Sequence, residues 1–204
     1  MNELSRTVDL DVALQERDDE KGASGDLGNR LLKHRVIVIA KPIDRRVMER
    51  TAAAAMLLDS ENSSAPITVI VNSPGGDADS GFAIYDILRF VKSPVRTLCC
   101  GLAASAAVPI FLSSERGRRF CTPNSRFLIH QPSMQMTGQA SDMEITANEI
   151  VKIRDRYNEI IAAETGKPSK QILKDANRDF WLSATEAKEY GLVDKVVIKR
   201  SEIE

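Results

Sequence analysis

A serine within a run of very small side chains is the first group in this sequence that could do covalent chemistry. Ser105 lies in residues 101–107 (GLAASAA), between a short apolar run expected to be a strand and an apolar stretch expected to be a helix. Backbone N–H groups at a helix start are unpaired and partly positive, which suits them to stabilise an oxyanion. Ser105 is therefore a candidate nucleophile, and a serine that merely caps the helix is the alternative.

Attack by a serine hydroxyl requires a base, and the chain offers two histidines. His34 lies between Lys33 and Arg35 and is most simply a solvated side chain. His130 ends the apolar run 127–130, a place from which side chains commonly project into a site. A hydrogen-bonded structural histidine fits the same pattern equally well.

The third group of such a site is a carboxylate that orients the imidazole. Asp179 precedes the apolar residues 180–182, which could exclude water around it, but an acid in a surface loop fits equally well. Local sequence leaves these candidates open: Asp77, Asp175, Asp179 and Asp194.

A glycine-containing turn could add backbone donors. Residues 72–77 (NSPGGD) follow an expected strand and precede an expected helix, where amides are available to an anion or a carbonyl oxygen. An ordinary tight turn is the alternative. The chain has no G-x-x-x-x-G-K-[ST] motif and no dinucleotide fingerprint, so we do not expect it to drive a nucleotide-powered motor itself.

Composition limits the class of protein. The 204 residues are 43% hydrophobic and 28% charged with a net charge of -1, which suits one globular domain. No basic stripe interleaved with aromatic residues suggests a nucleic-acid partner. Three cysteines without a C-x-x-C pair argue against a disulfide framework or metal site and favour a reducing compartment. Without an apparent signal sequence or membrane span, we expect a cytoplasmic protein with no membrane partner.

Repeated units of a strand followed by a helix must position these groups. Residues 1–30 are expected to form a flexible segment, since residues 16–30 are charged and glycine-rich, and residues 31–204 the folded domain. Strands are expected at 36–40, covered on both faces, and at 67–71, 95–100, 119–121, 127–130 and 196–198. Such an order predicts an α/β fold with parallel strands joined by right-handed crossovers.

Helix signals separate these strands. Asp44 is expected to cap the first helix, and Ser141, with Glu144 in capping-box spacing, the longest one, which Gly166 ends. A short helix is expected near 169–176. Ser183 and Glu186 form a second capping box.

Short motifs in a specific order carry a resemblance to a known family. They are SPGG at 73–76, AAS at 103–105, PNSR at 123–126, IHQP at 129–132, GQA at 138–140, RD at 178–179 and YGLVD at 190–194. Over residues 31–199 the chain resembles the proteolytic subunit of the Clp protease, ClpP. The resemblance implies Ser105 as nucleophile, His130 as general base, Asp179 as its partner, and the amides of Gly76 and Ala106 as the oxyanion hole.

The same resemblance implies an architecture and partners. It implies the ClpP/crotonase-like fold with a protruding handle at about 131–166, two stacked seven-subunit rings around a chamber, and a AAA+ unfoldase that uses ATP to deliver unfolded polypeptides. This chain would need no cofactor and no metal. Further implied roles are substrate-backbone pairing by Gly75, Gln131, Pro132 and Ser133, an unfoldase dock at Ile70, Leu98, Phe120 and Val197, and a ring contact at Arg178.

Several positions depart from the family's usual pattern. Ala106 and Ala107 stand where Met-Gly is usual, and Pro109 fits only if it lies in the first helical turn. Thr68 and Thr122 are more polar than matching dock positions, Asn177 replaces an acidic partner of Arg178, and residues before 31 match poorly. A catalytically silent structural subunit in a mixed complex, and a crotonase-like acyl-CoA enzyme, are the alternative functions.

Overall fold

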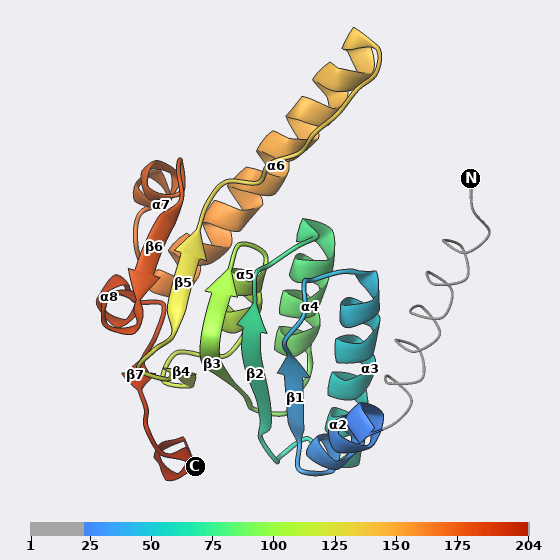
Figure 1. Ribbon diagram of the computed structural model, residues 1–204, viewed down its shortest axis with the longest axis vertical. Coiled ribbons are helices and arrows are strands. Elements are labelled where there is room, and N and C mark those ends of the chain that lie inside the picture. Colours follow the sequence, from blue (N-terminus) through green and yellow to red (C-terminus); the bar gives the residue numbers. More distant parts are fainter. Residues whose placement is uncertain (1–22, 204) are drawn as a thin grey trace, which may run out of the picture.

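One seven-stranded sheet organises residues 23–203, which the computed structural model describes (Figure 1). Strands β1 (Val36–Ile39), β2 (Ile67–Ser73), β3 (Val95–Ala104), β4 (Arg119–Cys121) and β7 (Lys195–Val196) lie parallel in that order. Strand β5 (Arg126–Ile129) pairs in parallel with the far end of β3, and β6 (Phe180–Ser183) pairs antiparallel with β5. The predicted α/β class is confirmed, with β6 as an antiparallel addition.

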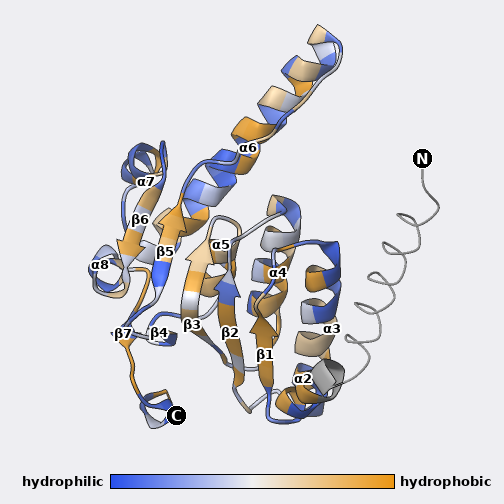
Figure 2. Ribbon diagram, viewed as in Figure 1, coloured by the Kyte–Doolittle hydropathy of each residue, from blue (hydrophilic) through white to orange (hydrophobic). Residues whose placement is uncertain are grey.

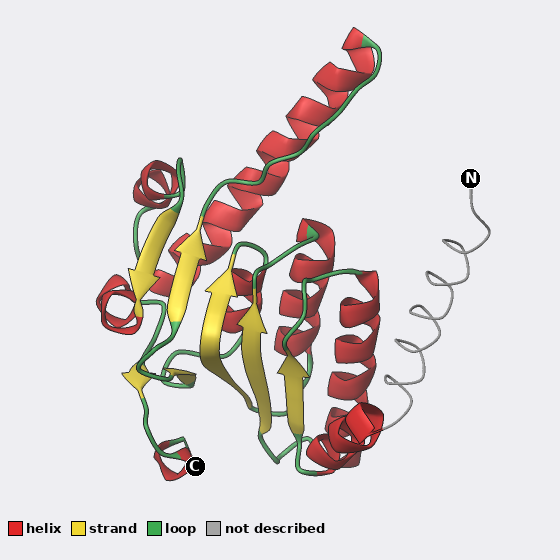
Figure 3. Ribbon diagram, viewed as in Figure 1, coloured by secondary structure: helices red, strands yellow, loops and turns green. Residues whose placement is uncertain are grey.

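Helices cover one face of this sheet. Helices α3 (Arg45–Glu61), α4 (Ala78–Phe90) and α5 (Ala107–Leu112) lie behind β1 to β3 (Figures 1 and 3). Every side chain of α5 is buried. Along β2, burial alternates, so that Ile67, Val69 and Val71 are fully buried while Thr68 and Ile70 are partly exposed. Figure 2 shows the hydrophobic colour gathered on these central strands.

The expectation that both faces of the first strand are covered is wrong. Val38 in β1 is 47% exposed, because helices α3 to α5 lie on the other face of the sheet (Figure 1), and its register partner Ile70 in β2 is partly exposed on the same side. The apolar run was read correctly as a strand, but its continuous hydrophobicity does not require a cover from within this chain.

Helix ends follow the capping residues with one exception. Asp44 accepts a hydrogen bond from the Val47 amide (2.8 Å), and the Ser183–Glu186 capping box of α8 (Ala184–Tyr190) is present. The long helix α6 (Ala140–Thr165) ends at Gly166 in the left-handed conformation. Its expected cap at Ser141 is wrong: the helix begins at Ala140, so Ser141 already lies within the first turn, and the cap residue Gln139 makes no side-chain bond.

Two boundaries differ from the sequence prediction. Helix α2 (Ala23–Lys33) precedes β1, so helical structure begins before residue 31, with Leu32 packed against the core. Residues 1–22, where most of the expected flexible segment falls, lie outside the described residues. Helix α7 (Ser169–Asp175) lies where a short helix was expected, and the 3₁₀ turn η1 (Arg200–Glu202) follows β7.

A buried ion pair fixes the base of α6 to the sheet. Arg119 of β4 is 1% exposed and donates to the Glu164 carboxylate and to the carbonyl oxygens of Leu112, Ser114 and Glu164. Tyr85 and Arg89 of α4 also donate to Glu164 (2.8 and 2.9 Å). Beyond this base, α6 projects away from the sheet (Figure 1). No helix in the described part of the chain combines the length and apolar character needed to cross a bilayer.

Candidate active site

Ser105 lies in a strained turn between a strand and a helix. Strand β3 runs to Ala104 and α5 starts at Ala107, so the serine is presented at the carboxyl edge of the sheet. Its φ of +54° is in the left-handed region, which a non-glycine residue adopts at a cost and which is typical of a nucleophile elbow. The cap of α5 is Ala106, without a side-chain bond, so the interpretation of Ser105 as an ordinary helix cap is wrong. Pro109 lies in the first turn, as the fold requires.

The glycine turn packs directly on this elbow. A Cβ atom on Gly75, whose φ is +89°, would lie 2.5 Å from the Ala104 carbonyl oxygen and 2.7 Å from the Ser105 Cβ. A Cβ on Gly81, in the first turns of α4, would lie 3.0 Å from the Ala106 Cβ. Two glycines therefore allow the loop after β2 and the helix that follows it to touch the serine turn.

Two amides beside the serine lack hydrogen-bond acceptors. Neither the Gly76 nor the Ala106 N–H donates a hydrogen bond within residues 23–203. The neighbouring backbone amides are paired: the Asp77 N–H donates to the Ile43 carbonyl oxygen (2.8 Å), and the Ser105 N–H donates to the Leu128 carbonyl oxygen (2.9 Å). Gly76 and Ala106 both line the cavity that contains Ser105. Two unpaired donors at such a place can stabilise an oxyanion.

Strand pairing brings the histidine and one aspartate together. Because Ile129 of β5 is paired with Phe180 of β6, the residues just beyond each of them, His130 and Asp179, lie side by side. The His130 Nδ1 is 3.4 Å from an Asp179 carboxylate oxygen. This pairing holds one ring nitrogen toward the acid and leaves Nε2 for the cavity.

The water exclusion expected around Asp179 is wrong. The Asp179 side chain is 64% exposed, because Trp181 points outward from β6 and stacks under the Arg126 guanidinium at 4.3 Å instead of covering the carboxylate. Alternation along the strand turns Leu182 inward and Trp181 out.

The other three carboxylates hold the fold. Asp77 caps α4 by accepting from the Ser80 amide (2.8 Å). Asp175 accepts from the Tyr190 hydroxyl (2.7 Å), and Asp194 from the Gly117 and Arg119 amides. Among the described residues, Asp179 is thus the acid paired with a histidine.

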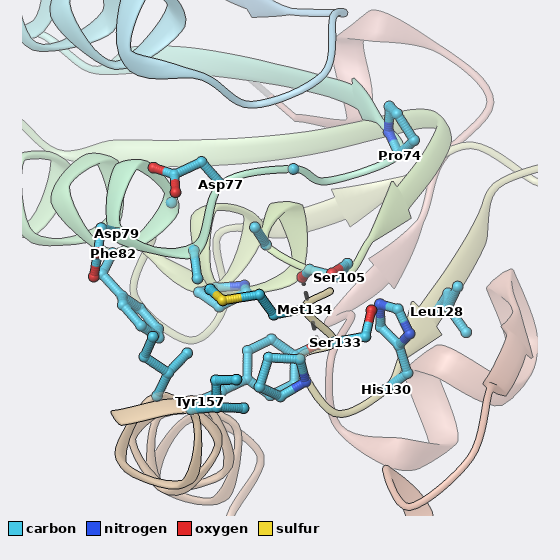
Figure 4. A pocket seen from close by; sticks show the side chains of 18 residues that line it. Pro74, Asp77, Asp79, Phe82, Ser105, Leu128, His130, Ser133, Met134 and Tyr157 are labelled. Atoms are coloured by element: carbon cyan, nitrogen blue, oxygen red, sulfur yellow. Dashed lines mark hydrogen bonds between the residues drawn. The ribbon is translucent and has the colours of Figure 1, made fainter. Parts of the chain in front are cut away.

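Ser105 and His130 face one cavity of about 420 Å³ (Figure 4). Within the described part of the chain, no hydrogen bond joins the serine hydroxyl to the ring, a looseness common in sites without substrate. The opposite wall is apolar and includes side chains that sequence reasoning did not select. They are Phe82, Met134, Ile150, Ile153 and Tyr157. The apolar spacing along the long helix was the available signal for three of them, but it does not say which turn meets the serine.

The cysteines are poor competing nucleophiles. Burial raises the pKa of Cys99 to about 12 and that of Cys121 to about 11. Burial also raises the pKa of the half-buried Cys100. All three are free thiols. Across residues 23–203, no three histidine, cysteine or acidic side chains lie close enough to hold a metal ion.

Two of the residues expected to pair with the substrate backbone, Gly75 and Gln131, already use backbone groups in hydrogen bonds within the chain. The Gly75 carbonyl accepts from the Ile43 amide (2.8 Å), and the Gly75 amide donates to the Ser73 hydroxyl, so both backbone groups of Gly75 already make a hydrogen bond within the chain. The Gln131 amide donates to Ala176 (2.9 Å), since this segment is tied to the end of α7. The Gln131 carbonyl and the backbone of Ser133 have no partner among the described residues, and Pro132 lies between them on the cavity wall.

The remaining expected contacts lie outside the cavity lining, and Phe120 among them is only 9% exposed. Ile70, Leu98 and Phe120 are register partners and form one row across β2, β3 and β4. Val197 follows β7 beside Cys121 but is only 3% exposed. Arg178 is exposed and lines a depression with His130 and Asp179.

Comparison with known proteins identifies the family of the chain. The Clp protease family matches residues 19–200 of the sequence. The chain belongs to the Clp protease family. This match begins before residue 31, so part of the segment judged to match poorly is included.

Individual members of the Clp protease family resemble most of the chain. It is 42% identical to ATP-dependent Clp protease proteolytic subunit 2 of Treponema denticola over 93% of this chain and 94% of that protein. It is 46% identical to proteolytic subunit 1 of Salinibacter ruber over 84% of this chain and 74% of that protein. An asparagine-to-aspartate mutant of ClpP1 from Listeria monocytogenes superposes with a TM-score of 0.81 at 38% identity, covering 87% of this chain and 99% of that one.

Membership in the Clp protease family has two consequences. It classes the chain as a Clp-type serine endopeptidase with the ClpP fold. It also leaves the acyl-CoA alternative without support.

Proposed function

We propose that this chain is a catalytically active peptidase subunit that works through an acyl-enzyme. The Ser105 hydroxyl attacks a peptide carbonyl while His130 Nε2 takes its proton, and Asp179 orients the ring through Nδ1. The Gly76 and Ala106 amides receive the negative charge on the carbonyl oxygen. His130 then returns the proton to the leaving amine, and water releases the acyl group by the reverse path. The observation that carries the proposal is the serine at positive φ beside two unpaired amides and the His130–Asp179 pair.

The substrate is extended, unfolded polypeptide. A peptide lying between the turn at Gly76 and residues 131–133 could pair with the free carbonyl of Gln131 and the free backbone of Ser133. Gly75 already uses its amide and one lone pair of its carbonyl within the chain, so its share in this pairing would be through the second lone pair.

We further propose that the subunit assembles into two stacked heptameric rings in the cytoplasm. Helix α6 buries only Tyr157, Asn158 and Ile161 within the described chain, and it exposes Ile145 and Val151 on the projecting part, which a second ring would cover. Arg178 would contribute a contact between rings. The row of Ile70, Leu98 and Phe120, with Val197 beside it, would receive a AAA+ unfoldase that spends the ATP.

Replacing Ser105 with alanine tests the chemistry and the assembly together. We expect Ser105→Ala to abolish hydrolysis of a fluorogenic peptide and labelling by a fluorophosphonate, while native mass spectrometry finds the same particle mass as for the wild type. Ser113→Ala is a matched control, because Ser113 is buried at the other end of α5. Turnover that survives Ser105→Ala would refute the assignment of the nucleophile.

A silent structural subunit is the second candidate. The absence of a hydrogen bond between the side chains of Ser105 and His130 in the described chain favours it. In that case the purified assembly would neither hydrolyse peptide nor react with the fluorophosphonate, and activity would appear only on mixing with an active paralogue.

A further inference from the structure

Tyr157 is a buried phenol that the reaction scheme above leaves without a role. It lies near the base of α6, is 5% exposed and lines the cavity across from Ser105 (Figure 4). Its hydroxyl donates a hydrogen bond to the backbone carbonyl oxygen of Ser105 (3.4 Å). Tyr157 is one of three buried residues of α6, with Asn158 and Ile161.

The peptide unit that Tyr157 contacts has a second function in the proposed mechanism. The Ser105 carbonyl and the Ala106 N–H belong to the same planar peptide, so a bond that fixes the carbonyl also fixes the direction of the N–H. The Val108 amide donates to the same oxygen (2.9 Å). A hydrogen bond to a peptide carbonyl also polarises its N–H and strengthens the bond that this N–H donates.

We propose that Tyr157 is a positioning residue of the active site, which holds the Ser105–Ala106 peptide with its N–H directed into the oxyanion hole. The inference rests on the proposed peptidase function and deepens it. Because Ser105 is held at positive φ, its neighbouring peptide lacks the support of a regular helix, and two donors on the carbonyl oppose its rotation.

The phenol is suited to this task over the working pH range. Burial raises the pKa of Tyr157, and a backbone hydrogen bond from His130 offsets a part of that rise. The hydroxyl therefore keeps its proton and remains a donor at neutral and moderately alkaline pH. A bond of 3.4 Å is long for two oxygens, and we expect it to shorten when negative charge on the substrate oxygen draws on the Ala106 amide.

Tyr157→Phe tests the role, since it removes the hydroxyl and keeps the ring that fills the cavity wall. Loss of a whole oxyanion donor lowers kcat by roughly 10²–10³-fold, so loss of its support should lower kcat by about tenfold with little change in KM. Inhibition by a peptide boronate, which forms a tetrahedral adduct, should weaken by a similar factor. The ³¹P shift of the fluorophosphonate adduct on Ser105 should also move.

Tyr85→Phe is the matched control, because it removes a hydroxyl bonded to Glu164, away from the serine turn. We expect it to leave kcat and the ³¹P shift unchanged. The positioning role alone would be overturned if Tyr157→Phe left kcat, boronate affinity and the ³¹P shift unchanged while hydrolysis by the wild type was lost in Ser105→Ala. A wild-type assembly without serine-dependent hydrolysis would overturn the proposed function and this role together.

Discussion

Replacing Glu164 with leucine should destabilise the chain far more than its surface position on a long helix suggests. The carboxylate is only 12% exposed and faces the Arg119 guanidinium, which is 1% exposed. Leucine would leave a buried cation without its counter-ion, while the three backbone carbonyls around Arg119 would still hold it in place. Breaking a buried pair in this way costs about 3–5 kcal/mol, a large share of the roughly 5–15 kcal/mol that stabilises a typical domain.

Arg89→Met is the matched comparison for the loss in free energy of unfolding. Arg89 donates to the same carboxylate, but its side chain is 43% exposed, so its loss should cost at most about 1 kcal/mol. Both variants would be unfolded in urea at one fixed protein concentration, since the proposed subunit association would add to stability, and followed by far-ultraviolet circular dichroism. Equal midpoints for Glu164→Leu and Arg89→Met would refute the view that the buried pair holds the base of α6.

Two further perturbations address the active site and the thiols. Gly75→Ala should lower kcat/KM by about 10²-fold or more, because the new Cβ would lie 2.5 Å from the Ala104 carbonyl oxygen and must displace the serine turn. Peptide hydrolysis at the wild-type rate would show that the turn tolerates the shift. Gly117→Ala is the control for backbone strain alone, because Gly117 has an equally positive φ with open space around it. Cys99 and Cys121 should resist iodoacetamide in the folded protein at pH 8, because burial raises the pKa of Cys99 to about 12 and that of Cys121 to about 11. Both thiols should react after unfolding. Peptide mass mapping that finds them alkylated in the native protein would contradict their burial.

Local signals in the sequence predicted most helix ends and the positions of most strands. Asp44 and Ser183 cap helices as expected, since a side-chain oxygen three residues before an unpaired amide acts within one turn. Ser141 satisfies the same pattern yet lies inside the helix, because Ala140, a strong helix former, allows the first turn to start earlier. The prediction for Val38 is wrong because an apolar strand covered on one face and an apolar strand covered on both faces can have the same local sequence.

The site shows where local reasoning stops. The strand-to-helix position of Ser105 and the strand end of His130 could be read from short segments. The choice of Asp179 among four acids could not, because it depends on the antiparallel pairing of two strands nearly fifty residues apart, and it came from the family resemblance instead. Tyr157 was assigned only to an apolar helix face, since nothing in helical spacing shows which turn reaches the serine.

The register between β5 and β6 has a consequence for how this enzyme can vary. Everything in residues 131–178, including the projecting helix, leaves the sheet at His130 and returns at Asp179, while the ladder below holds those two ends together. The projecting part of this excursion can therefore lengthen, shorten or change its sequence without moving His130 relative to Asp179. The part proposed to form the contact between rings and the part proposed to transfer the proton are in this sense free to diverge at different rates.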